Sequence, residues 1–446
     1  RTTSCPSLGT GAPAAPQLGG PMWETLFDRM ARTIVRNGAL TVTYPDGKSR
    51  TYGDGTGTPA HLVIHDERAL RRIAINPELA FGECYMDGWI GFADDDLRGF
   101  LGVALRNLGV GRRTFLHTWL GRFRKLARTV QQWNPMGTAQ RNVAHHYDLS
   151  AQLYDLFLDR DKQYSCAYFK HPDDSLETAQ AQKKTHIADK LLIEPGMRVF
   201  DIGCGWGGMA LTLARDYGAE VLGVTLSEEQ HKIATARARA EGLEDRVEFR
   251  LADYRTVTGK FDRVVSVGMF EHVGVPHYRE YFQNVRDRLT DDGVALIHTI
   301  GRTTPPGYTS PWIRKYIFPG GYIPSMSEVL KAVEKQGLYP TDIEVWRLHY
   351  AETLRHWEER FSANHDRVAE LYDERFCRMW RFYLIAAEMT FRHNNQWGCQ
   401  FKPARRQEAA HPVDRGPHHR HQADPNAEFA AIGEHRPHPP HQHNPA

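Results

Sequence analysis

The residues with the most specific chemical meaning form a glycine-rich stretch, residues 199–208, which reads VFDIGCGWGG. A β-branched run precedes it and helix-forming residues 209–217 follow, so the stretch is predicted to join a strand to a helix. Gly203, Gly205 and Gly207 allow the backbone to turn sharply and pass close to a ligand, and the start of the following helix offers free N–H groups. The stretch therefore predicts a cofactor-binding loop.

Two cofactors fit such a loop. The GxGxxG spacing of residues 203–208 is that of dinucleotide-binding proteins, which also need an acidic residue at the end of the second strand to bind the ribose. Residues 225–227 are Thr-Leu-Ser instead, which weakens that alternative. Asp201 before the glycines, and the adjacent pair Gly207 and Gly208, favour S-adenosylmethionine. A glycine turn without a ligand is the remaining alternative.

The elements that must position this loop are short apolar runs separated by helical segments. They are residues 198–202, 220–224, 247–251, 263–267 and 294–298. This alternation predicts an α/β fold with a doubly wound, mostly parallel sheet. Ligands of such sheets bind beyond the carboxyl ends of the strands, so the residues just after each strand are site candidates.

Several of these positions suggest a role. Ser227 to Gln230 form a predicted capping box, which leaves Thr225 and Leu226 facing the cofactor. Asp253 after the third strand is expected to contact the adenine amine, with a loop-turn acid as the alternative. Tyr254 beside it is expected to stack on the adenine or to cover the core.

Composition limits the function. Of 446 residues, 56 are Lys or Arg and 54 are Asp or Glu, a net charge of +2 that argues against a nucleic-acid-binding polycation. Six scattered cysteines without a CxxC pair fit a reducing compartment and predict no metal site. No apolar run is long enough to span a bilayer, and no secretory signal is recognisable, so a cytoplasmic location is expected.

The chain divides into five predicted segments. Residues 1–21 form a disordered lead, 22–110 a small α+β domain, 111–145 a basic linker or helix, 146–402 the sheet domain and 403–446 a disordered His/Pro-rich tail. From Leu97 to Tyr147 there is no acidic residue, while arginines such as Arg122, Arg124 and Arg128 alternate with aromatic and aliphatic residues. This amphipathic basic pattern is typical of contact with an anionic membrane, and equally of packing between domains.

Several motifs occur in an order that resembles the cyclopropane-fatty-acyl-phospholipid synthases. They are residues 164–169 (YSCAYF), the glycine loop, 223–227 (GVTLS), 269–274 (MFEHVG), 298–301 (HTIG) and 312–321 (WIRKYIFPGG). The resemblance covers roughly residues 22–400. It implies a seven-stranded methyltransferase sheet behind a smaller N-terminal lipid-handling domain. It further implies an enzyme peripheral to the inner face of the membrane that acts on an unsaturated phospholipid, and it leaves a homodimer open.

The resemblance also implies how the chemistry is done. The methyl carbon of S-adenosylmethionine adds to a cis double bond, and the resulting carbocation loses a proton to a bound bicarbonate ion. The residues expected to hold that ion, called here the bicarbonate set, are Cys166, Glu271, His298, Tyr350 and the backbone of Ile300. The residues expected at the cofactor are Tyr164, Ser165, Asp201, Gly203, Gly205, Gly207, Thr225, Leu226, Gln230, Asp253 and Tyr254.

Each of the four side chains in the bicarbonate set has a structural alternative. Cys166 could be a small buried hydrophobe, Glu271 a solvated loop acid and His298 a core histidine. Tyr350 could be a packing residue in an edge strand predicted at residues 344–349. Aromatic side chains that could stabilise the carbocation are Tyr164, Tyr168, Phe169, Phe270, Tyr316 and Phe318.

The sequence leaves several alternative functions open. A related lipid methyltransferase would give a methyl-branched or methylene product from the same cation. A small-amine N-methyltransferase would use the same fold without a bicarbonate site. A non-catalytic lipid-binding protein and an NAD-dependent oxidoreductase are the alternatives from other classes.

Overall fold

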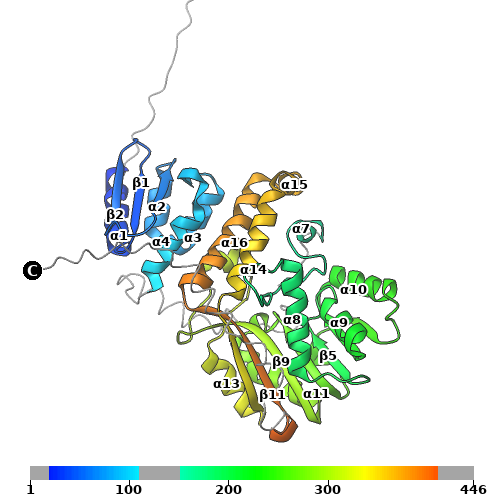
Figure 1. Cartoon of the computed structure of the whole chain (residues 1–446). Helices are drawn as coiled ribbons and strands as arrows, with labels where there is room; N and C mark the ends of the chain where they lie inside the picture. Colours follow the sequence, from blue (N-terminus) through cyan, green and yellow to red (C-terminus); the bar gives the residue numbers. More distant parts are fainter. Residues whose placement is uncertain (1–19, 110–150, 410–446) are drawn as a thin grey trace, which may run out of the picture.

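The computed structural model describes residues 20–109 and 151–409 of the chain (Figure 1). The predicted lead, the basic segment 111–145 and most of the tail lie outside these ranges. In the described ranges, no helix combines the length and apolar character that crossing a membrane would require. The described residues form a small N-terminal module and a larger α/β domain (Figure 1).

The N-terminal module, residues 20–109, packs helices on a four-stranded sheet with the order β2-β1-β3-β4. Its strands are β1 (Ala39–Thr43), β2 (Ser49–Gly53), β3 (Ala60–Ile64) and β4 (Ile90–Phe92). Its helices are α1 (Gly20–Ile34), α2 (Arg68–Ile75), α3 (Pro77–Met86), the short 3₁₀ turn η1 (Ala93–Asp95) and α4 (Leu97–Gly109). Strands β1 and β3 alternate buried and half-buried residues, as expected for a sheet with one face on a core.

The larger domain is built on a seven-stranded sheet with the order β10-β11-β9-β8-β5-β6-β7. The strands are β5 (Arg198–Ile202), β6 (Glu220–Thr225), β7 (Val247–Leu251), β8 (Phe261–Val267), β9 (Leu289–Arg302), β10 (Tyr339–Trp346) and β11 (Gln396–Ala404). Strands β5 to β9 pair in parallel, while β11 runs antiparallel to both of its neighbours. This confirms the predicted doubly wound, mostly parallel sheet.

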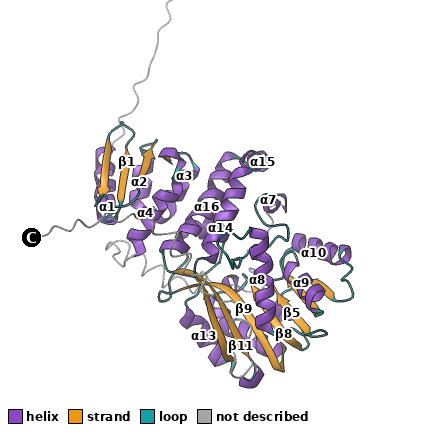
Figure 2. Cartoon of the chain, in the orientation of Figure 1, coloured by secondary structure: helices purple, strands orange, loops and turns teal. Residues whose placement is uncertain are grey.

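Helices cover both faces of this sheet (Figure 2). In β5, Val199 packs with α8 (Leu176–Leu191), α9 (Gly208–Tyr217) and α10 (Glu228–Ala240). The next residue, Phe200, packs with α11 (Tyr278–Arg288) and α13 (Met326–Lys335). Because successive side chains of a strand point to opposite faces, β5 is buried on both faces of the sheet from Val199 to Ile202.

The remaining helices lie at the carboxyl end of the sheet and beside the N-terminal module (Figure 1). They are α7 (Ala151–Asp155), α12 (Pro311–Tyr316), α14 (His349–Ala363), α15 (His365–Leu371) and α16 (Glu374–His393), with 3₁₀ turns η2 (Tyr254–Thr256), η3 (Phe270–His272) and η4 (Val275–His277). The 3₁₀ turn η5 (Gln407–Ala409) follows β11 at the opposite end of the sheet, beside the start of β9.

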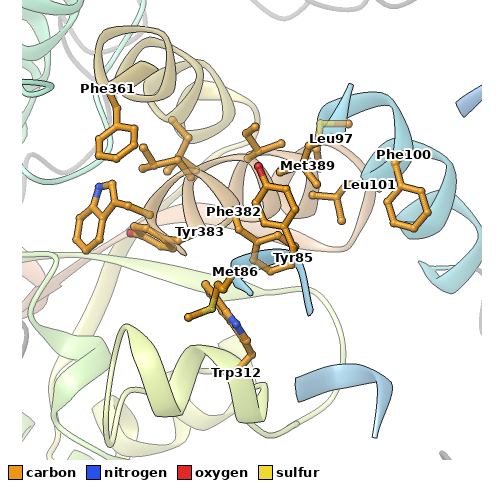
Figure 3. Packing of buried hydrophobic residues seen from close by; sticks show 14 of the residues in the cluster. Tyr85, Met86, Leu97, Phe100, Leu101, Trp312, Phe361, Phe382, Tyr383 and Met389 are labelled. Carbon is orange, nitrogen blue, oxygen red and sulfur yellow. The ribbon is translucent and has the colours of Figure 1, made fainter. Parts of the chain in front are cut away.

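One hydrophobic core joins the module to the α/β domain. Figure 3 shows Phe382 of α16 lying between Tyr85 of α3 and Trp312 of α12, with ring-centroid distances of 5.9 and 4.8 Å. Buried charges reinforce the contact, since Arg98 of α4 pairs with Glu358 and Glu388 at 2.9 Å each. The module is therefore positioned rigidly over the helices that follow the sheet.

Two expectations about the end of the chain need correction. Tyr350 does not lie in an edge strand: β10 ends at Trp346, and Tyr350 lies in the first turn of α14. Buried Leu354, Trp357 and Phe361 continue a helical spacing that the strand prediction overlooked. The fold also extends past residue 402, because β11 pairs with β9 and β10 as far as Ala404.

Candidate functional site

A cavity of about 160 Å³ lies at the carboxyl ends of β5, β6, β7 and β8; it is called here the smaller cavity. All of the predicted cofactor residues but one line it: Tyr164, Ser165, Asp201, Gly203, Gly205, Thr225, Leu226, Gln230, Asp253 and Tyr254. The sequence prediction missed other lining residues, among them Gln163, His272 and Pro319. These residues come from loops whose backbone path depends on packing against segments far away in the sequence.

Gly207 is the exception, since it is not among the lining residues. It caps α9 with a φ of +85°, and a Cβ there would lie 2.6 Å from Cζ of Phe249. At Gly208 a Cβ would lie 2.5 Å from Oδ2 of Asp161. The paired glycines are therefore required by close packing around the loop, not by contact with this cavity.

Asp201 supplies an unpaired acceptor to the smaller cavity. Its side chain is almost fully buried, and Oδ2 has no hydrogen-bond partner among the described residues. Burial raises the pKa of Asp201 to about 7. A buried acceptor without a donor fits a ligand that brings one, and S-adenosylmethionine carries ammonium and hydroxyl donors.

The loop after β6 is held by side-chain hydrogen bonds. Thr225 Oγ1 donates to Oε1 of Gln230 at 2.8 Å, and Ser227 Oγ accepts from the Gln230 N–H at 3.3 Å. Only half of the predicted capping box forms here, because the Gln230 side chain turns toward Thr225 instead of the backbone of Ser227. The carboxylate of Asp253 forms an ion pair with Arg255, in which Nη2 of Arg255 lies 2.7 Å from Oδ2 of Asp253.

A second cavity of about 860 Å³, the larger cavity, lies between the N-terminal module and the α/β domain. Three residues line both cavities: Tyr164, Gly268 and His272. Gly268 follows β8 with a φ of +68°, a conformation that favours glycine and keeps this junction free of a side chain. Burial lowers the pKa of His272 to about 4, so this imidazole is neutral at physiological pH.

The walls of the larger cavity are mainly aromatic and aliphatic. Of the six aromatic residues expected to stabilise a cation, Tyr164 and Phe318 line it, while Tyr168, Phe169, Phe270 and Tyr316 do not. Tyr168 is instead stacked between His186 and His349 in the core, at 4.5 and 4.7 Å. Aromatic residues that the prediction did not include complete the wall near the junction: Tyr322, Phe382, Tyr383 and Phe391.

Members of the bicarbonate set meet around Gly398 of β11. Glu271, Ile300 and Tyr350 line the larger cavity, and Gly398 is the register partner of Ile300. Sγ of Cys166 lies 3.7 Å from the Cβ position of Gly398. Five sequence positions that span 185 residues of chain, Cys166 to Tyr350, are thus gathered at one end of β9.

Cys166 and His298 lie behind the cavity wall and do not line either cavity. Trp346 contacts both: it belongs to the buried cluster of Cys166, and its ring meets His298 edge-on at 4.6 Å. His298 Nδ1 accepts from the amide of Gln400 at 3.2 Å. Burial raises the pKa of the Cys166 thiol and lowers that of His298 to about 3, so both side chains are neutral.

Comparison with known proteins identifies the family. Residues 136–401 match the family model described as mycolic acid cyclopropane synthetase, and residues 23–107 match a domain of unknown function. The cyclopropane-fatty-acyl-phospholipid synthase of Escherichia coli (strain K12) is 40% identical over 338 residues, which are 75% of this chain and 85% of that protein. The tuberculostearic acid methyltransferase UfaA1 of Mycobacterium tuberculosis is 38% identical over 362 residues, or 76% of this chain and 84% of that one.

Solved structures agree with this assignment. The cyclopropane synthase MmaA2 from Mycobacterium tuberculosis has a TM-score of 0.58 and 31% identity, covering 61% of this chain and 99% of that chain. The mycolic acid cyclopropane synthase CmaA1, complexed with SAH and CTAB, has a TM-score of 0.57 and 32% identity over the same shares. The dinucleotide alternative is thereby set aside. The chain belongs to the mycolic acid cyclopropane synthetase family and is an S-adenosylmethionine-dependent methyltransferase.

Proposed function

We propose that the enzyme transfers the methyl carbon of S-adenosylmethionine to a cis double bond of a phospholipid acyl chain and forms a cyclopropane ring. One observation carries this proposal: the smaller cavity meets the larger one at Tyr164, Gly268 and His272. A methyl donor in the first and an apolar chain in the second would face each other across this junction. Methyl transfer to an alkene depends mainly on such positioning.

The reaction needs a water-poor chamber. The alkene π electrons form a bond to the methyl carbon as the C–S bond breaks, which leaves a carbocation on the acyl chain. The aromatic faces of Tyr164, Tyr383 and Phe318 at the junction would stabilise that cation. Neutral His272 adds no repulsive charge there, and loss of a proton from the new methyl group closes the ring.

We propose that bicarbonate is the proton acceptor, held near Glu271 and the backbone of Ile300. The support is an unpartnered acceptor: Oε2 of Glu271 is buried without a hydrogen-bond partner among the described residues. Burial raises the pKa of Glu271, and the O–H group of a bicarbonate ion could donate to this oxygen. Bound bicarbonate would supply a base in this dry chamber. Omitting bicarbonate in a CO₂-free buffer should therefore lower the rate, and its addition should restore it.

We propose that the N-terminal module binds the far part of the acyl chain. Apolar side chains of α1, α2, α4 and the module's sheet continue the wall of the larger cavity away from the junction; they include Phe27, Met30, Ile34, Leu62, Ile73 and Leu105. A mainly apolar cavity of about 860 Å³ is of the size that ligand sites commonly have. The match to a domain of unknown function would thus mark an acyl-chain-binding wall.

We further propose that the enzyme works at the inner face of the membrane. Leu108 at the end of α4 lines the larger cavity and is 48% exposed, so the cavity reaches the surface there. The predicted basic segment 111–145 begins directly after it in the sequence. Charge reversal at Arg122, Arg124 and Arg128 should weaken binding to anionic vesicles, by about 1 kcal/mol for each residue. Unchanged vesicle binding at moderate salt would instead support packing between domains.

The central test combines labelled S-adenosylmethionine with vesicles of an unsaturated phospholipid. The proposal expects the acyl chain to gain the mass of one CH₂ group, with loss of the double bond and release of S-adenosylhomocysteine. No gain on the unsaturated chain would reject the proposal. Gas chromatography of the released chains then separates a cyclopropane from a methyl-branched or methylene product, an alternative favoured by the similarity to a tuberculostearic acid methyltransferase.

A further inference from the structure

Lys183 of α8 has an environment that a purely structural lysine rarely has. Its side chain is 0% exposed, yet in residues 20–109 and 151–409 no carboxylate lies within ion-pair distance of its ammonium. The other lysines of this helix are paired, Lys184 with Asp161 at 2.5 Å and Lys190 with Asp342 at 2.6 Å. A buried ammonium whose direct partners are neutral is costly even with the carboxylates of Asp159 and Asp161 acting on it at longer range, so its contacts need a reason.

Those contacts lead to the wall of the smaller cavity. Nζ of Lys183 donates to Oε1 of Gln163 at 2.7 Å and to Oγ of Ser165 at 2.8 Å. Both acceptors line the smaller cavity and flank Tyr164, which lines both cavities. One turn earlier, Gln180 donates to the carbonyl oxygens of Gln163 and Ser165 at 3.2 and 3.0 Å. Helix α8 therefore holds this short segment through its backbone and through its side chains.

The ammonium also determines how the Ser165 hydroxyl is used. An ammonium can only donate, so the Ser165 oxygen must accept, and its own proton remains available for another acceptor. In the smaller cavity that acceptor would be an oxygen of the cofactor, such as the carboxylate of its amino-acid end. Burial lowers the pKa of Lys183 to about 8, so the charged form still predominates at neutral pH.

We propose that Lys183 is a positioning residue for the methyl donor: it orients Gln163 and the Ser165 hydroxyl toward the cofactor and fixes Tyr164 at the junction of the two cavities. The inference rests on S-adenosylmethionine binding in the smaller cavity. It concerns a side chain that lines neither cavity, so it acts through Gln163 and Ser165 rather than by direct contact.

The test measures binding of S-adenosylhomocysteine by calorimetry to the wild-type chain, K183M and K190M. Lys190 is the matched control, because it is equally buried on the same helix but is paired with carboxylates at the far end from the smaller cavity. We expect K183M to lose about tenfold or more in affinity, since charge-assisted hydrogen bonds are lost, while K190M stays within about twofold. In kinetics, KM for S-adenosylmethionine should rise more than kcat falls.

A double-mutant cycle with S165A separates positioning from general damage. If Lys183 acts through Ser165, adding K183M to S165A should cost clearly less affinity than K183M alone. An equal loss in both backgrounds, or wild-type affinity in a folded K183M, would overturn the inference. Should K183M not fold, K183Q, which keeps a neutral donor, takes its place in the same cycle. Failure of the wild-type chain to bind S-adenosylhomocysteine would instead reject the cofactor site itself.

Discussion

Glu271 and Ile300 are joined by a hydrogen bond of 2.6 Å, in which the backbone N–H of Ile300 donates to Oε1 of Glu271. This bond ties the 3₁₀ turn after β8 to the end of β9 and leaves Oε2 of Glu271 buried without a partner among the described residues. The carboxyl group is therefore fixed in orientation, with one oxygen available to a ligand in the larger cavity.

Replacing Glu271 by Gln should abolish most product formation without loss of cofactor binding. The amide keeps the shape of the side chain but cannot take the same protonation states, so we expect a fall of about a hundredfold or more in kcat. Glu271 does not line the smaller cavity, and affinity for S-adenosylhomocysteine should stay within about twofold of wild type. An unchanged product yield would contradict a catalytic role for Glu271.

Asp201 should make the stability of the cofactor-free enzyme depend on pH. Its folded-state pKa is raised to about 7 by burial, above the ordinary value of 3.8, because the folded state disfavours the charged form. The contribution of the neutral carboxyl group to the free energy of unfolding is thus fully present below about pH 4. It is lost as the pH rises through 7, and the loss is about 4 kcal/mol at most.

The measurement compares urea unfolding of the wild-type chain and D201N between pH 4 and 8. The difference in free energy of unfolding between them should change over this window, since D201N cannot titrate. Parallel pH profiles would show that Asp201 ionises normally in the folded enzyme.

A positive charge at His272 should discriminate between the methyl donor and its product. S-adenosylmethionine carries a sulfonium charge that S-adenosylhomocysteine lacks, and His272 lies where the two cavities meet. H272K should weaken binding of S-adenosylmethionine about tenfold or more relative to S-adenosylhomocysteine. The neutral variant H272Q should leave the ratio of the two affinities unchanged, and an equal ratio in H272K would place this side chain away from the sulfonium.

A bulky side chain of the N-terminal module that fills the larger cavity should impair use of the acyl chain but not binding of the cofactor. Ala104 of α4 lines the cavity, so A104W should lower product formation about tenfold or more, because the double bond would be displaced from the junction. Affinity for S-adenosylhomocysteine should not change. The control R106W places the same residue on an exposed position of the same helix, and an equal loss in both variants would argue against a chain-binding role for the module.

The sequence alone was enough for the five parallel strands of the sheet and most of the cofactor loop. The runs at 198–202 and 247–251 coincide with β5 and β7, because β5 is buried along most of its length and β7, at the sheet edge, alternates buried and exposed residues. Asp201, Gly203 and Thr225 were predictable as lining residues, since the carboxyl ends of parallel strands meet at one edge of the sheet.

Only the tertiary structure decided the direction of the side chains that lie away from this edge of the sheet. Tyr164 faces both cavities while Tyr168, four residues later, is stacked in the core, and no local pattern distinguishes them. The position of Tyr350 depends on α14, and the walls of the larger cavity depend on α4 meeting α16 across more than half of the chain. Local spacing encodes the period of a strand or helix, whereas the partners of a side chain are set by packing between segments far apart in the sequence.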